Sequence, residues 1–142
     1  MYTYKYPRPA LTVDALVIKK ETAEILLIQR GAEPFKGRWA LPGGFVEIDE
    51  LLADACRREL EEETGLILYD LNQFRVYDAV ERDPRSRTIS VVFYGFAEKD
   101  ARIKGADDAA DAAWFGLDQL PELGFDHAQV INDFFAVLNQ PR

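Results

Sequence analysis

The sequence predicts a single-domain α/β protein in which helices cover both faces of a mixed β-sheet. Its 142 residues, 48% of them hydrophobic, suffice for one sizeable core. β-Branched and leucine-rich segments typical of strands alternate with two segments of helical periodicity. No internal repeat, low-complexity tract or linker divides the chain, so we expect one domain over residues 1–142.

The predicted strands follow from short apolar runs bounded by turn residues. Residues 11–18 and 24–29 form a hairpin around a polar turn. Residues 31–44 are loop-like, since they contain prolines, glycines and only one short apolar segment. Further strands are predicted over 72–79 and 88–96, joined by a polar turn at 81–87, and over 113–117.

Two helices are predicted from capping and periodicity. The first covers about 50–64, with Asp49 as its N-cap and Gly65 at its end. The second begins at Asp126, which forms a possible capping box with Gln129. Its apolar stripe consists of Val130, Ile131, Phe134, Phe135 and Leu138.

The net charge is -8, from 25 acidic and 17 basic residues. This balance argues against nucleic acid or an anionic membrane as a partner bound mainly by charge. The negative charge is concentrated in two blocks, residues 44–66 with eight acidic and two basic residues, and residues 105–142 with seven and one. Such blocks require a local explanation.

Other features of the sequence indicate the cellular environment of the protein. Cys56 is the single cysteine, so no intrachain disulfide is possible. The N-terminus has no apolar stretch after a basic start, and the apolar runs are too short for a membrane span. We therefore expect a cytoplasmic protein with no membrane partner.

The first predicted helix carries an unusual acidic stripe. At helical spacing, Glu59, Glu62 and Glu63 continue an apolar stripe that begins with Leu52, Ala55 and Cys56. Clustered carboxylates on a buried side repel one another unless a cation neutralises them. Oxygen ligands without histidine or cysteine favour Mg²⁺, with Mn²⁺ as the alternative. The competing interpretation is a solvated acidic helix face.

Residues 44–66, GFVEIDELLADACRRELEEETGL, match the Nudix box at every fixed position. The chain therefore resembles the Nudix hydrolase superfamily, which implies an α/β/α sandwich with a mixed sheet. It also implies metal-dependent hydrolysis of a nucleoside diphosphate linked to another group. The flanking strings EPFKGRWALPGG, RDPRSRTISV, GADDA and FDHAQVI resemble the ADP-ribose pyrophosphatase branch, so that the likeness covers about residues 7–138.

The resemblance assigns roles to the box. It implies that Glu59, Glu62 and Glu63 bind the metal together with a backbone carbonyl of Gly43 or Gly44. One of these carboxylates, or one from a later loop, would accept the proton of the attacking water. Arg58 lies within i, i+4 reach of Glu62, so we expect it to orient the catalytic acids rather than contact substrate. An ordinary surface ion pair is the alternative.

Candidate substrate contacts come from several segments of the sequence. Arg82, Arg85 and Arg87 share one turn and could grip phosphate or ribose, or simply stabilise that turn. Phe45 could stack on adenine. Asp108, beside Asp107, is a candidate in a loop that resembles the mobile loop of related pyrophosphatases. His127, the single histidine, is either a phosphate contact or a residue with a structural hydrogen bond.

The resulting hypothesis is hydrolysis of ADP-ribose to AMP and ribose 5-phosphate, a small-molecule nucleotide being the partner. Pyrophosphohydrolysis of nucleoside triphosphates, oxidised ones included, or of other sugar nucleotides is one alternative. Another is a non-catalytic ADP-ribose sensor. Such regulators need a DNA-binding module after the Nudix domain, and the end of the chain at Arg142 speaks against that reading. An alternating Tyr2, Tyr4 and Tyr6 in the N-terminal arm suggests a homodimer interface.

Overall fold

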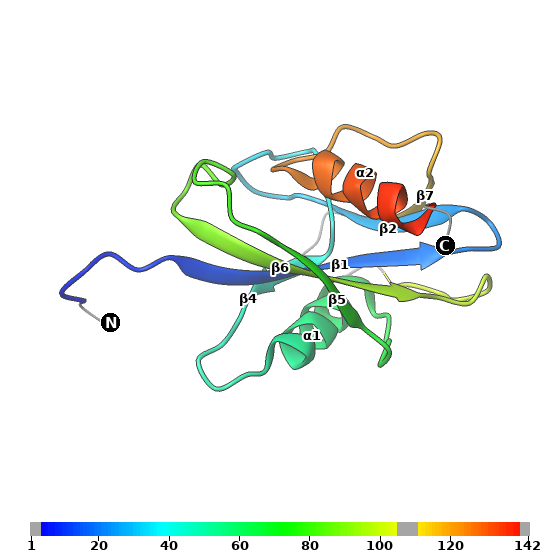
Figure 1. Cartoon of the computed structure of the whole chain (residues 1–142). Coiled ribbons are helices and arrows are strands. Elements are labelled where there is room, and N and C mark those ends of the chain that lie inside the picture. Colours follow the sequence, from blue (N-terminus) through cyan, green and yellow to red (C-terminus); the bar gives the residue numbers. More distant parts are fainter. Residues whose placement is uncertain (1–3, 105–110, 140–142) are drawn as a thin grey trace.

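The computed structural model describes residues 4–104 and 111–139 (Figure 1). Its strands and helices are β1 (Ala10–Lys19), β2 (Glu24–Gln29), β3 (Trp39–Ala40), β4 (Gly43–Phe45), α1 (Leu52–Thr64), β5 (Asn72–Tyr77), β6 (Thr88–Phe96), β7 (Asp111–Gly116) and α2 (His127–Leu138). The predicted hairpin, the later strands and both helices are therefore confirmed, with ends that shift by one or two residues.

The sheet is mixed, as predicted. Its strand order is β3-β2-β1-β6-β5, with β4 paired to β1 and β7 paired to β2. β1 runs parallel to β6 from Ala10 to Ile18, while the other strand pairs are antiparallel. β1 pairs with β2 only at its last two residues, and earlier along β1 its partner is β4, which places Gly43 opposite Asp14.

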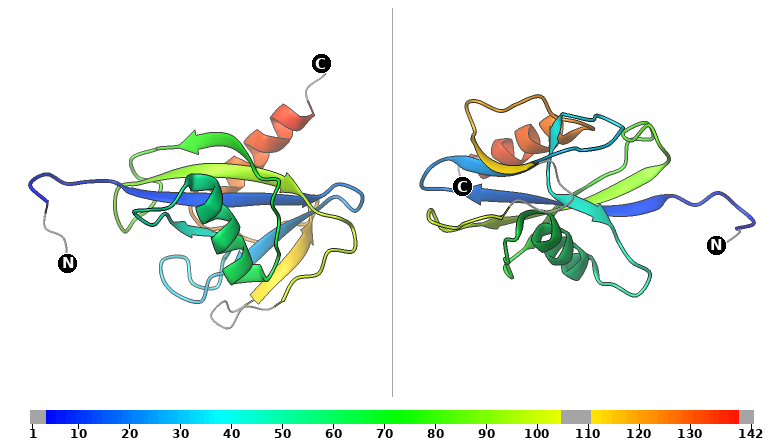
Figure 2. Two further views of the ribbon diagram at one scale, coloured as in Figure 1. Left: turned by 90° about the horizontal axis from the view of Figure 1, so that it is seen from below. Right: turned by 180° about the vertical axis from the view of Figure 1, so that it is seen from behind.

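The two helices lie on opposite faces of the sheet, α1 on one side and α2 on the other (Figures 1 and 2). Each helix covers its own apolar core. Under α1 the buried residues include Ala55, Cys56 and Leu60, packed against alternate residues of β1. Under α2 they include Val130, Ile131 and Phe134. The predicted α/β/α sandwich is therefore confirmed.

The end of α1 matches the prediction, but its start does not. Gly65 adopts a left-handed conformation with φ of 74°, and its N–H donates to the carbonyl of Glu61. The residue at the N-cap position is Leu51, with no side-chain cap bond, so the prediction that Asp49 caps the helix is wrong. The helix begins two residues later than predicted, after Leu51 in an extended conformation, because the Glu50 side chain binds Arg58, as described below.

The N-terminus of α2 differs from the capping box expected for it. Asp126 occupies the N-cap position, but its side chain makes no capping hydrogen bond. Both carboxylate oxygens instead accept bonds from Arg82. The predicted cap is wrong because a buried guanidinium competes successfully with the helix backbone for this carboxylate.

Neither helix within the described residues has the length and apolar character needed to cross a bilayer. The apolar stripe predicted for α2 is confirmed over Val130, Ile131 and Phe134, which are buried. It does not extend to Leu138, which is 41% exposed at the last turn.

Candidate active site

A cavity of about 470 Å³ opens where β4, α1, the turn before β6 and the start of α2 meet. It is lined by Thr12, Asp14, Ile28, Arg30, Ala40, Leu41, Gly43, Gly44, Phe45, Val46, Glu47, Arg58, Glu59, Glu63, Arg82, Asp83, Arg85, Thr88, Phe125 and His127. Most residues predicted for the site are thus brought together, although they come from segments far apart in the sequence.

Glu63 lies deepest among the carboxylates of α1. Its Oε1 accepts a hydrogen bond of 2.7 Å from the backbone N–H of Gly43. Burial raises the pKa of Glu63 to about 8, and the nearby charges of Glu59 and Asp14 act in the same direction. Close to neutral pH this carboxyl therefore holds a proton until a cation compensates its charge.

Glu59 occupies the space above the second glycine of strand β4. A Cβ atom built on Gly44 would lie 2.5–2.6 Å from the Glu59 carboxylate, too close for any real side chain. Burial also raises the pKa of Glu59, although Arg58 counteracts the effect. Gly44 thus leaves the room in which the Glu59 carboxylate lies, and a larger residue here would displace that carboxylate.

Glu62 does not share this environment. Its side chain is 58% exposed, and it is absent from the cavity lining. The inward orientation predicted for Glu62 is wrong because the buried side of α1 also includes Leu60 and Thr64. These two residues rotate the centre of the buried face towards Glu63 and away from Glu62.

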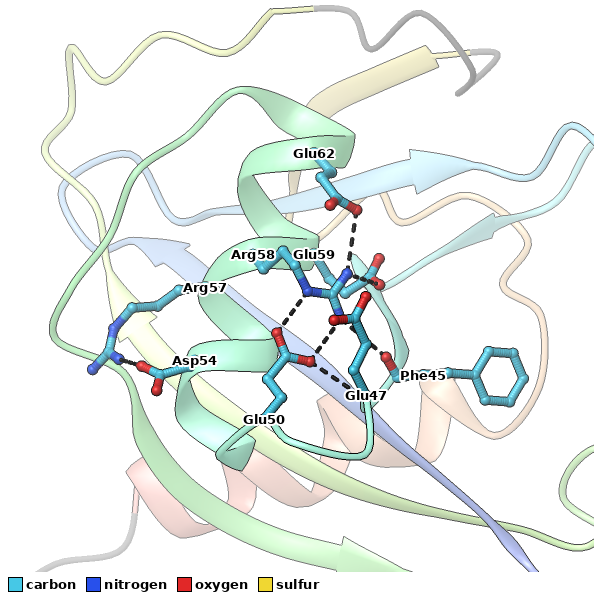
Figure 3. A network of polar contacts seen from close by, with 8 residues as sticks. All are labelled: Phe45, Glu47, Glu50, Asp54, Arg57, Arg58, Glu59 and Glu62. Carbon is cyan, nitrogen blue, oxygen red and sulfur yellow. Dashed lines mark hydrogen bonds and ion pairs between the residues drawn. The ribbon is translucent and has the colours of Figure 1, made fainter. Parts of the chain in front are cut away.

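Arg58 connects the acids of the box (Figure 3). It donates to both oxygens of Glu50 at 2.7 and 2.9 Å, to Glu59 at 2.8 Å and to Glu62 at 3.4 Å. A further bond reaches the carbonyl of Phe45. The bonds from Arg58 lower the pKa of Glu50 to about 2. Arg58 thereby fixes the β4–α1 connection, and it touches the acids as the sequence predicted.

An acidic residue that sequence analysis did not single out lies at the floor of the cavity. Asp14, on β1, is 8% exposed and accepts a hydrogen bond from the Ser90 hydroxyl. Nε2 of His127 lies 3.7 Å from it. Burial alone would raise the pKa of Asp14, but His127 and Ser90 bring it below its usual value. A charged residue within an otherwise apolar strand was the available signal.

His127 has the structural bond that was one of its two predicted roles. Its Nδ1 accepts the backbone N–H of Leu41 at 3.0 Å, and the residue is 3% exposed. This bond ties the first turn of α2 to the segment that leads into β4.

The three arginines of the 81–87 turn have different surroundings. Arg82 is buried and donates to Asp126 through Nε and Nη2 at 2.9 and 2.7 Å. Arg85 is partly exposed, pairs with Asp83, and lies 5.7 Å from the ring of Phe45. Arg87 donates to backbone carbonyls of its own turn and is absent from the cavity lining. The structure thus brings Arg82 and Arg85, but not Arg87, to the site.

The residues fit a divalent cation between α1 and β4. Glu59 and Glu63 supply oxygen donors, their pKa values are raised by burial, and the glycines of β4 leave space beside them. No group of three acidic, histidine or cysteine side chains is already arranged as a metal site within residues 4–104 and 111–139. Asp107 and Asp108, which were predicted near the substrate, lie outside the described residues.

Comparison with known proteins identifies the class. The NUDIX domain family matches residues 8–134, so the chain belongs to the Nudix family of hydrolases. It is 45% identical over 129 residues to the ADP-ribose pyrophosphatase of Methanocaldococcus jannaschii, covering 91% of this chain and 75% of that protein. It is 34% identical to the ADPR responsive transcriptional repressor NtrR of Acinetobacter baylyi, covering 94% of this chain but only 56% of the repressor.

Solved structures agree with this family. The NUDIX domain of Shewanella oneidensis NrtR complexed with ADP ribose has a TM-score of 0.86 and 30% identity, and the match covers 97% of this chain and 94% of that domain. A bifunctional NMN adenylyltransferase/ADP ribose pyrophosphatase from Francisella tularensis, complexed with AMP and a manganese ion, has a TM-score of 0.85 and 36% identity. That match covers 94% of this chain and 43% of the other. The Nudix fold predicted from residues 44–66 is confirmed.

Proposed function

We propose that the protein hydrolyses ADP-ribose to AMP and ribose 5-phosphate with the help of a divalent cation, Mg²⁺ being the physiological ion. The observation that carries the proposal is the pair of partly buried carboxylates, Glu59 and Glu63, which contact the glycines of β4 inside a cavity that is also lined by arginines. The 45% identity to an ADP-ribose pyrophosphatase supports this choice of substrate.

The metal would be held by Glu59, Glu63 and the backbone carbonyl of Gly43, with Glu62 completing the set from the exposed side of α1. When bound, it neutralises the charge of the pyrophosphate and of the carboxylates and so promotes attack by water. Oxygen donors of this kind suit Mg²⁺ and Mn²⁺ alike. The manganese ion in the Francisella structure is consistent with a site that binds either of these cations.

In the reaction, the oxygen of water forms a bond to one phosphorus, and the bond from that phosphorus to the bridging oxygen breaks. A carboxylate of the site accepts the proton of the water, and the bridging oxygen leaves with the second phosphate. Arg58 positions Glu59 and Glu62 through its hydrogen bonds. Arg85 would contact substrate phosphate, Phe45 would stack on adenine, and Arg82 would hold the turn that presents Arg85.

A substrate panel tests the assignment. ADP-ribose, other nucleotide sugars and nucleoside triphosphates, including 8-oxo-dGTP, are compared by kcat/KM with Mg²⁺ and with Mn²⁺. We expect ADP-ribose to rank first and to yield AMP as the nucleotide product. A triphosphate or another sugar nucleotide ranking first would overturn the substrate proposal while leaving the metal-dependent chemistry intact.

A second candidate is an ADP-ribose sensor without turnover. The 34% identity to the NtrR repressor favours it, as does the likeness to the Shewanella domain complexed with ADP ribose. Isothermal titration separates the two functions when the solution in the calorimeter is analysed for AMP afterwards. Tight binding with ADP-ribose still intact after several hours would establish the sensor and exclude the enzyme.

We further propose that residues 1–142 form one cytoplasmic domain that assembles as a homodimer through its N-terminal arm. The support is the extended course of residues 4–9 away from the sheet, with Tyr6 68% exposed (Figure 1). Light scattering after size exclusion should give twice the mass of 16.2 kDa. Removal of residues 1–9 should then give the mass of a monomer.

A further inference from the structure

The cavity is lined by groups of both charges. Glu59, Glu63 and Asp14 are among its carboxylates, and Arg30 and Arg85 are among its guanidinium groups. Arg58 and Arg82 also line the cavity, but they are ion-paired with Glu50, Glu59 and Asp126. Arg30 and Arg85 are therefore the lining guanidiniums with the most remaining capacity to bind a ligand.

Arg30 directly follows β2 and is positioned through one nitrogen. Its Nε donates to the carbonyl of Pro34 at 2.6 Å, and its guanidinium lies 5.0 Å from the ring of Phe125. Within the described residues, neither Nη1 nor Nη2 has a hydrogen-bond partner, and no carboxylate lies within ion-pair distance. The backbone bond and the ring thus hold a guanidinium whose terminal N–H groups remain available.

Arg85 reaches the same ring from the turn before β6. Its guanidinium lies 5.6 Å from Phe125 and 5.7 Å from Phe45. Asp83 accepts bonds from Nε and Nη2 and thereby fixes its orientation. Nη1 has no partner among the described residues. Phe125 accordingly lies beside both arginines, and all three residues line the cavity.

The electrostatics of this arrangement favour an anion. Burial lowers the pKa of Arg30 from its usual value and the positive charge of Arg85 lowers it further, while the carboxylates of Asp83, Glu63 and Glu33 offset only part of this effect. A partly buried guanidinium beside a like charge is costly unless an anion shares it. A phosphate group matches the planar fork of an arginine and can bind two arginines at once.

We propose that Arg30, together with Arg85, binds the phosphate of the substrate that is not held at the carboxylates, which makes Arg30 a substrate-binding residue. The inference rests on the proposed function, because a pyrophosphate offers one phosphate to the carboxylates and one to the arginines. One phosphate lies at Glu59 and Glu63 through a cation, and the other lies directly on the arginines. Arg30 would then select substrates with two adjacent phosphates over monophosphates.

The test compares wild type with Arg30→Gln, Arg30→Lys and the matched control Arg75→Gln. Arg75 lies on β5, outside the cavity lining, where it pairs with Asp133. Isothermal titration measures the binding of three probes in the presence of Mg²⁺, namely inorganic pyrophosphate, the non-hydrolysable α,β-methylene ADP-ribose, and adenosine, which has no phosphate. Binding of Mg²⁺ alone is measured as well, because it reports on the carboxylates Glu59 and Glu63.

We expect Arg30→Gln to bind both phosphate probes about tenfold or more weakly, because the loss of a charged hydrogen bond has an effect of this size. Arg30→Lys should recover part of this loss, since it keeps the charge but not the fork. The affinity of Arg30→Gln for adenosine and for Mg²⁺ should change by less than about twofold. The affinities of the Arg75→Gln control for all probes should change equally little. A loss of packing around Phe125 would instead weaken all probes alike.

Unchanged binding of pyrophosphate in Arg30→Gln would overturn the inference whatever the substrate proves to be. If Arg30→Gln weakens the binding of adenosine as much as that of pyrophosphate, the inference is also overturned, because Arg30 then has a structural role. If wild type binds pyrophosphate through Arg30 but neither binds the ADP-ribose analogue nor hydrolyses ADP-ribose, the proposed function fails and the phosphate site stands. If wild type binds none of the phosphate probes, both fail.

Discussion

The backbone N–H of Gly43 donates a hydrogen bond of 2.7 Å to the carboxyl of Glu63 and thereby joins β4 to α1 across twenty residues of sequence. The same backbone segment pairs with β1, where Gly43 lies opposite Asp14. Helix, strand and sheet therefore meet at one residue, and the geometry of the proposed metal site depends on this contact.

The two glycines of β4 should respond differently to alanine. In Gly44→Ala the new methyl group displaces only the Glu59 carboxylate, so we expect a folded protein with Mg²⁺ affinity reduced about tenfold or more. In Gly43→Ala it meets the backbone of Val13 and Asp14, so we expect a loss of about 2–4 kcal/mol of stability. Urea unfolding and isothermal titration measure both. Equal destabilisation by the two changes would contradict this account.

The stability of the metal-free protein should depend on pH through Glu63. Its pKa rises from 4.5 to about 8 on folding, so the folded state retains a proton that the unfolded state releases between these values. The stability linked to the protonated Glu63 carboxyl is fully present below pH 4.5 and is lost as the pH rises towards 8.

Thermal unfolding of wild type and Glu63→Gln between pH 5 and pH 8.5 measures this effect. The Tm of the variant relative to that of wild type should rise with pH, by about 5–15 °C between pH 5 and pH 8.5. Glu61→Gln, a change at an exposed residue of the same helix, serves as the matched control and should keep a constant difference from wild type. A constant difference for Glu63→Gln as well would show that burial does not control its protonation.

The ion pair between Arg82 and Asp126 should matter for stability through its buried charge. The Arg82 side chain is only 3% exposed and is bound through two nitrogens. Asp126→Ala leaves this guanidinium without its carboxylate, so we expect a loss of about 3–5 kcal/mol. The double change Arg82→Met and Asp126→Ala should recover much of it in urea unfolding. A loss in the double variant as large as in the single one would argue against an uncompensated charge as the cause.

Cys56 should be inert in the folded protein. The residue is 1% exposed beneath α1, and burial raises the pKa of its thiol to about 12. Because the thiolate is the reactive form, a thiol reagent at pH 8 should label native protein very slowly and unfolded protein within minutes. Rapid labelling without denaturant would mean that α1 opens readily from the sheet.

Much of the fold could be predicted because local signals agree with it. The strands are bounded by turn residues, and Gly65 ends α1 through a conformation that glycine adopts easily. Errors arose where a tertiary contact competes with a local one. Asp126 binds Arg82 instead of capping α2, and Glu50 binds Arg58 instead of beginning α1.

The site could be predicted only in part from the sequence, again because tertiary contacts determine which residues belong to it. The spacing within the box located Glu59 and Glu63 on the buried side, but helical periodicity alone could not exclude Glu62, because the true buried face includes Leu60. Asp14 and Arg30 were not found, since each becomes part of the site only through segments more than ten residues away in sequence. Their exposure, partners and charge follow from the packing of the sheet.

The central claim is that Glu59 and Glu63 hold the divalent cation on which hydrolysis depends. It is tested most directly by following AMP release from ADP-ribose with wild type, with Glu59→Gln/Glu63→Gln and with the surface control Asp54→Asn, each with Mg²⁺ and after chelation. We predict a rate about a thousandfold or more lower in the double variant, no activity after chelation, and control activity within about twofold of wild type. A double variant that is folded, as judged by its thermal unfolding, and that retains a tenth or more of the wild-type rate would contradict the claim.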